Sequence, residues 1–282
     1  MTITDANYFS TATDIYMSNS QWKVWRECPA QAHARFIRHV WQPEKTKPLA
    51  VGSLVDALLL EPDAESRVLA EYEDLLTKAN TKAGIAKGGP ERVPNADSKL
   101  AYQMAEKIKS IPAIMAIVDA CDHQAQYTFE LGGMAWKCRL DLLNLDAGWI
   151  WDLKTTASTT DEKFVERIGA RGNFIAQFNY VRQLALYREA VRQNEDRVCR
   201  VGIIAQSKAN PADLRVFPWQ TNAYSQIDDA IANVLSNINY VSELRESDPE
   251  DLSRCERCDY CIESRQDYVF PYADPERKQK GW

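Results

Sequence analysis

Residues 136–154 read WKCRLDLLNLDAGWIWDLK, and this stretch decides the fold. Apolar and polar residues alternate in its first half, and the segment NLDAG separates them from a second apolar run, a pattern that predicts a β-hairpin. If the turn is centred on the Asp-Ala pair of that segment, Asp141 lies opposite Asp152. Arg139 then lies opposite Lys154, so all four side chains share one face of the hairpin.

Two carboxylates that face each other across a ladder repel, so we expect a cation to offset Asp141 and Asp152. Hard oxygen ligands at this density suit Mg²⁺ or Mn²⁺, which leave further coordination positions to water and phosphate. Lys154 could orient or deprotonate an attacking water, or neutralise charge in the transition state. The alternative is a surface strand with ordinary ion pairs, but the apolar neighbours of Asp152 favour a central strand.

The rest of the chain predicts one mixed α/β domain, because helical and strand periodicities alternate and no internal repeat is present. Ser18–His39 has helical spacing interrupted at Cys28-Pro29, which predicts two short helices. By the same criteria we expect further helices over residues 52–60, 100–111, 164–192 and about 224–245, a strand over 198–206, and a loop rich in Lys, Gly, Asn and Pro over 77–98.

Composition limits the classes of function. The net charge is −6, so any contact with nucleic acid must depend on local basic groups or on a metal in an acidic site. The polar amino terminus and the short apolar runs predict no signal peptide and no membrane span, and we expect a cytoplasmic protein.

Three of the seven cysteines lie together near the end of the chain. Cys255, Cys258 and Cys261 follow one another at three-residue steps, a spacing that lets a short turn direct three thiols at one centre. A metal there needs a fourth ligand. The alternative is three free thiols on a loop; the other cysteines, apart from Cys28, are expected to be small buried residues or free thiols.

Five segments in order resemble the motif series of the RecB-type and RecE-type PD-(D/E)xK nucleases. They are GSLVD ending at Asp56, Glu130, RLD ending at Asp141, DLKTT beginning at Asp152, and QLALY from Gln183 to Tyr187. The resemblance runs from about residue 18 to beyond 261. It implies a restriction-endonuclease-like core, with a central mixed β-sheet flanked by helices.

The resemblance also implies roles for individual residues. Asp56 would join Asp141 and Asp152 as a metal ligand, although the family usually has His at this position, and Glu130 is a weaker candidate ligand. Gln183 and Tyr187 lie four apart on one helical face, where they would contact DNA or brace Lys154.

The cysteines resemble those of AddB-type nucleases and of the CRISPR-associated relatives of RecB, which have one Cys-Pro near the start and three cysteines near the end. This implies that Cys28 completes a 4Fe-4S centre joining the N-terminal helices (about 18–60) to the cysteine-rich tail (about 250–282) of a single domain, 1–282. The last gap in the relatives is longer than that between Cys258 and Cys261. Zn²⁺ held by four thiolates is the competing possibility.

These features predict a Mg²⁺- or Mn²⁺-dependent exonuclease that acts on the ends of linear DNA in phage or bacterial recombination or repair. Arg139, Lys82 and Lys87, together with Lys78, would contact DNA. A single-strand annealing protein and a homo-oligomer are possible partners. The alternatives are an endonuclease or helicase-associated nuclease module, and a non-catalytic iron–sulfur or zinc protein that binds nucleic acid.

Overall fold

A computed structural model describes residue 3 and residues 7–78 and 91–265 of the chain. Five strands form the central sheet, in the order β3-β4-β5-β8-β9. These strands are β3 (Asp122–Leu131), β4 (Met134–Asn144), β5 (Trp149–Thr156), β8 (Arg200–Ser207) and β9 (Leu214–Pro218). Only β5 and β8 pair in parallel, so the sheet is mixed and β5 is its central strand.

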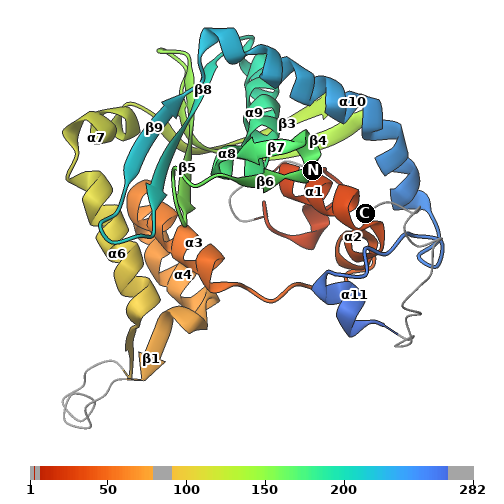
Figure 1. Cartoon of the computed structure of the whole chain (residues 1–282), viewed down its shortest axis with the longest axis horizontal. Coiled ribbons are helices and arrows are strands. Elements are labelled where there is room, and N and C mark those ends of the chain that lie inside the picture. The colour runs from red at the N-terminus through yellow and green to blue at the C-terminus, as the bar shows by residue number, and fades with distance from the viewer. Residues whose placement is uncertain (1–2, 4–6, 79–90, 266–282) are drawn as a thin grey trace.

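Helices cover both faces of this sheet (Figure 1). Consecutive residues of a strand point to opposite faces, so Ile150 packs with the helices α1, α2, α9 and α10, whereas Trp151 packs with α3, α4, α6 and α7. The helices are α1 (Asn19–Glu27), α2 (Pro29–Phe36), α3 (Lys47–Leu60), α4 (Glu65–Glu71), α6 (Ala96–Lys109), α7 (Pro112–Asp119), α8 (Phe174–Gln177), α9 (Tyr180–Glu195), α10 (Ser225–Glu246) and α11 (Asp259–Glu263).

Short elements complete the architecture. Two ribbons pair antiparallel: β1 (Leu76–Lys78) with β2 (Arg92–Pro94), and β6 (Lys163–Val165) with β7 (Ala170–Gly172). Single 3-10 turns are η1 (Thr11–Thr13), η2 (Pro62–Ala64), η3 (Glu73–Leu75), η4 (Glu166–Ile168) and η5 (Thr221–Ala223). None of the helices within the described ranges is long and apolar enough to cross a membrane.

The predicted hairpin forms in the predicted register. Leu142 pairs with Trp151, which is the ladder step next to Asp141 and Asp152. The regular pairing ends there, because an Asp141 carboxylate oxygen, rather than a strand carbonyl, accepts the Leu153 backbone N–H at 2.8 Å. Met17 then pairs with the part of β4 that β5 has left, bonding to the backbone of Ala135 and Lys137. β4 and β5 therefore part at the two aspartates.

Several predicted elements are confirmed. Pro29 separates α1 from α2, and the Ser18 side chain caps α1 in a capping box with Gln21. The last predicted helix corresponds to α10. The helix predicted over residues 52–60 begins earlier, at Lys47.

The predicted helix over 164–192 is wrong in its first half. Residues 163–172 form the β6–β7 ribbon, whose turn places Gly169 in the left-handed region at φ 61°, and Asn179 at φ 56° separates α8 from α9. Each such residue stops a helix. The prediction also missed β9 and α7, and the ends of the predicted 77–98 loop pair as β1 and β2.

Candidate active site

The carboxylates lie where β4 and β5 part. Asp141 stands on β4 one residue beyond the last paired step, Leu142–Trp151, and Asp152 stands at the corresponding position of β5, fully buried. Lys154 follows two residues later on the same face of β5. The parting of the two strands opens the space that these side chains occupy, so the local backbone creates the site.

Lys154 bridges the two aspartates. Its Nζ lies 2.6 Å from Asp152 Oδ2 and 3.9 Å from Asp141 Oδ2, which places both carboxylates on one side of the sheet, around one ammonium group. Burial opposes the charge on Lys154, but Asp152 and Asp141 outweigh it and raise the pKa of the lysine above its ordinary value. The ammonium is thus the cation that offsets the facing carboxylates.

Asp152 is held by a second set of contacts from α9. Gln183 Nε2 lies 3.3 Å from Asp152 Oδ1 and donates to the Tyr187 hydroxyl at 2.6 Å. Burial raises the pKa of Asp152 to about 7, with Lys154 lowering it and Asp141 raising it further. The predicted Gln183–Tyr187 pair therefore braces Asp152, and through it Lys154.

Asp56 approaches the same group from α3. It is partly buried, and its pKa is raised well above the ordinary value by burial and then by the charges of Asp141 and Asp152, with Lys154 opposing. Three acidic side chains whose charges meet around Lys154 provide oxygen donors for a hard divalent ion. Their chemistry suits Mg²⁺ or Mn²⁺, but their oxygens do not all lie within 4.8 Å of one another; Lys154 contacts two of the three.

Not every predicted residue joins this group. Glu130 is exposed near the end of β3 and pairs with Ala135, which is roughly 20 Å along β4 from Asp141 at the rise of a strand. Arg139 forms an ion pair with Glu61, at the end of α3, rather than lying over the aspartates. Lys78 is exposed on β1, and Lys82 and Lys87 lie outside the described residues.

Sequence reasoning missed Tyr180. Its ring centroid lies 5.2 Å from Lys154 Nζ, and burial is the main cause of its raised pKa. The available signal was its position three residues before Gln183, which puts both side chains on one face of α9. Tyr180 therefore belongs to the surroundings of Lys154.

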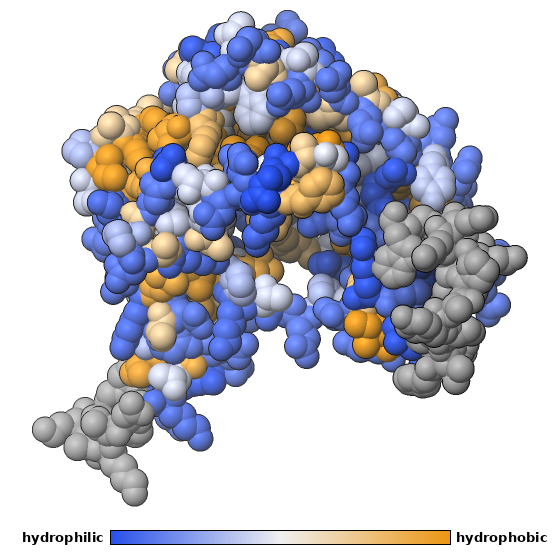
Figure 2. All heavy atoms as spheres, in the orientation of Figure 1, coloured by the Kyte–Doolittle hydropathy of each residue, from blue (hydrophilic) through white to orange (hydrophobic). Residues whose placement is uncertain are grey.

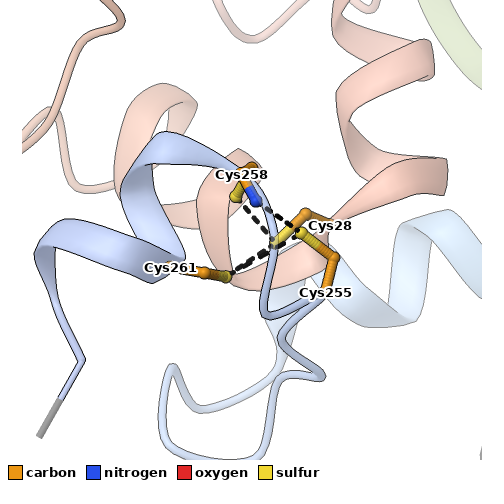
Figure 3. A group of neighbouring side chains, drawn as sticks. All are labelled: Cys28, Cys255, Cys258 and Cys261. Atoms are coloured by element: carbon orange, nitrogen blue, oxygen red, sulfur yellow. Dashed lines mark hydrogen bonds between the residues drawn. The ribbon is translucent and has the colours of Figure 1, made fainter. Parts of the chain in front are cut away.

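The four cysteines form a second centre, which links the N-terminal helices to the C-terminal tail (Figure 3). Their ligand atoms lie within 4.8 Å of one another, and they are the single such group of three or more metal-ligating side chains in the described part of the chain. Cys28 Sγ is 3.5 Å from Cys261 Sγ and 3.8 Å from Cys258 Sγ, and Cys255 Sγ is 4.0 Å from Cys261 Sγ.

These separations test which metal the thiols fit. Four thiolates bound tetrahedrally to Zn²⁺ at about 2.3 Å stand about 3.8 Å apart. In an iron–sulfur cube each thiolate binds a different iron, so the cluster holds the thiolates farther apart. The spacing between Cys28 and its partners therefore fits a single tetrahedral ion.

Comparisons with known proteins identify the family of this chain and a similar fold. A crystal structure described as a "Putative exonuclease" from Eubacterium rectale is similar, with a TM-score of 0.82 and 26% sequence identity over 99% of this chain and 98% of that chain. The structure of SSO0001 gives a TM-score of 0.28 and 12% identity over 74% of this chain and 84% of that chain, too low to indicate a shared fold. No curated protein matches in sequence. A family model described as "PDDEXK-like domain of unknown function (DUF3799)" matches residues 18–264, and the chain belongs to this PDDEXK-like family.

Proposed function

We propose that this chain is a DNA exonuclease that uses Mg²⁺ or Mn²⁺ to hydrolyse phosphodiester bonds at the ends of linear DNA. The observation that carries the proposal is the convergence of Asp141 and Asp152 on Lys154, braced by Gln183. Membership of the PDDEXK-like family supports a nuclease. The similarity to the Eubacterium rectale protein supports exonuclease action.

In this proposal Asp56, Asp141 and Asp152 hold the divalent ion. When bound, such an ion polarises the phosphate and lowers the pKa of a coordinated water. Gln183 fixes the orientation of Asp152 by donating to it, so this ligand is in place before substrate arrives. Lys154, as an ammonium beside both aspartates, stabilises negative charge that develops on the phosphate oxygens.

The test compares end-labelled linear DNA with closed circular DNA, each with Mg²⁺ and with EDTA. We expect the wild type to degrade linear DNA but not circular DNA, and to do so with Mg²⁺ but not with EDTA. Lys154→Ala should lose this activity. Lys99→Ala, a change of an exposed lysine on α6, is the matched control and should retain it. Cleavage of circles would identify an endonuclease, and binding without cleavage by the wild type would identify a non-catalytic protein.

For the cysteine centre we propose a structural Zn²⁺ that joins α2 to the tail and completes a single domain. The spacing of the thiols supports zinc, and the 4Fe-4S cluster implied by the resemblance to AddB is the alternative. Metal analysis of the purified chain distinguishes them: zinc gives a colourless protein, whereas iron gives absorbance near roughly 400 nm.

The proposed setting is the cytoplasm of a bacterium or a phage-infected cell, where recombination or repair exposes DNA ends. A single-strand annealing protein that takes up the product, or a homo-oligomer around the duplex, would be the partner.

A further inference from the structure

The β6–β7 ribbon and the adjoining α8 place large apolar side chains in solvent. Phe164 is 64% exposed, Ile168 46% and Phe178 49%. The ribbon lies in front of the sheet between β5 and α1 (Figure 1), and Figure 2 shows hydrophobic and strongly hydrophilic side chains side by side here, above a hollow in the surface. These exposed side chains lie close together in the sequence, on one ribbon and the helix that follows it. We therefore treat them as a candidate contact surface for a ligand.

These aromatic rings continue to the catalytic lysine. The Phe178 ring centroid lies 5.7 Å from that of Tyr180, and Tyr180 lies 5.2 Å from Lys154 Nζ. The Phe174 ring packs in the core behind them, with its centroid 6.0 Å from that of Tyr180. A ligand that stacks on Phe178 is therefore linked to Lys154 through the rings of Phe178 and Tyr180.

Two guanidinium groups beside the ribbon carry positive charge without an ion pair among the described residues. Arg167 donates to the Ala176 carbonyl, and Arg182 Nε donates to Asn19 Oδ1 at 2.8 Å. The charge of Glu27 opposes the lowering of the Arg182 pKa, but the ion pair of Glu27 is with Lys23. Burial lowers the pKa of Arg182 to about 10, and the charge of Arg167 adds to this shift. Arg182 is 9% exposed, so Arg167, which is exposed, is the guanidinium of the two that a phosphate in solvent can reach.

We propose that this surface, formed by Phe164, Phe178 and Arg167, binds a single-stranded DNA end and leads it to Lys154. The proposal rests on the proposed nuclease function and names its substrate form. Exposed rings stack on bases whose faces are free, and bases in a duplex already stack on each other. Arg167 contacts a phosphate of the same strand.

The first test measures binding in EDTA, where no cleavage occurs, with a fluorescent oligothymidylate and a blunt duplex of the same length. Changing Phe164→Ser and Phe178→Ser together should weaken oligothymidylate binding by about tenfold or more and change duplex binding little. Val198→Ser, which removes a side chain 61% exposed outside this surface, is the control and should bind as the wild type does. Equal binding by the double variant overturns the proposal.

The second test uses salt. Arg167→Gln should reduce the slope of log affinity against log salt for the oligothymidylate by about 0.7, the value for one phosphate contact on a single strand. Arg215→Gln removes the same charge from β9, where Arg215 pairs with Asp213, and should leave the slope unchanged. A change of oligomeric state in the phenylalanine variant, with DNA binding intact, would make the surface an interface between copies and refute the proposal.

Failure of this inference and failure of the nuclease function are distinguishable. If the wild type binds oligothymidylate through these residues but cleaves nothing with Mg²⁺, the binding surface stands and the nuclease function fails. If the wild type degrades linear DNA while the Phe164 and Arg167 variants bind as the wild type does, the nuclease function stands and the binding surface fails.

Discussion

Replacing Lys154 by alanine should destabilise the fold by an amount that a divalent ion can restore. The change removes the ammonium that lies 2.6 Å from Asp152 and 3.9 Å from Asp141, and leaves two facing carboxylates. Removing one partner of a buried pair costs about 3–5 kcal/mol. Because the side chains of Lys154 and Asp141 are 17% and 15% exposed, we reduce the expected loss to about 2–4 kcal/mol.

For a chain of this size, that loss lowers the unfolding temperature by roughly 10 °C. Thermal unfolding in EDTA measures it. Addition of Mg²⁺ should then raise the unfolding temperature of Lys154→Ala more than that of the wild type, since the ion takes over the neutralisation of Asp141 and Asp152. Lys99→Ala should unfold at the same temperature as the wild type. Equal unfolding temperatures of Lys154→Ala and the wild type in EDTA would refute the reasoning that the lysine offsets the carboxylates.

Three further changes test other parts of the structure. Gln183→Leu removes the donor to Asp152 Oδ1, so kcat on linear DNA should fall by about ten- to a hundredfold while circular dichroism stays unchanged; an unchanged kcat would exclude the brace. Cys261→Ser replaces a fully buried member of the cysteine centre, so elemental analysis should show loss of the proposed metal and calorimetry a lower unfolding temperature; retention of the metal would contradict the ligand set. Gly202→Ala would place a Cβ 2.3 Å from Trp151 Cζ3, so denaturant unfolding should show a loss of about 1–3 kcal/mol, and an unchanged midpoint would be evidence against this packing.

Local patterns in the sequence were sufficient wherever the answer depends on neighbouring residues. The alternation before Asp141 and the apolar run around Asp152 predicted the hairpin and its register, because side-chain direction in a strand repeats every two residues. Pro29 predicted the break between α1 and α2. The helix predicted over 164–192 failed since apolar spacing alone does not reveal a short ribbon turned at Gly169.

The place of Glu130 shows the limit of motif order. A motif series fixes the sequence in which residues occur, whereas distance along a strand decides whether their side chains meet. Glu130 stands near the far end of the β3–β4 hairpin from Asp141, so its order in the chain did not make it a neighbour of the aspartates.

The sequence by itself determined the β4–β5 hairpin and the facing of Asp141 and Asp152, since both follow from local periodicity and the turn between the strands. Only the tertiary structure decided which distant side chains meet them. Asp56 and Gln183 arrive on helices from opposite faces of the sheet. Cys28 meets Cys261 across 233 positions of chain. Such contacts depend on how helices pack over both faces of one sheet, which no local spacing encodes.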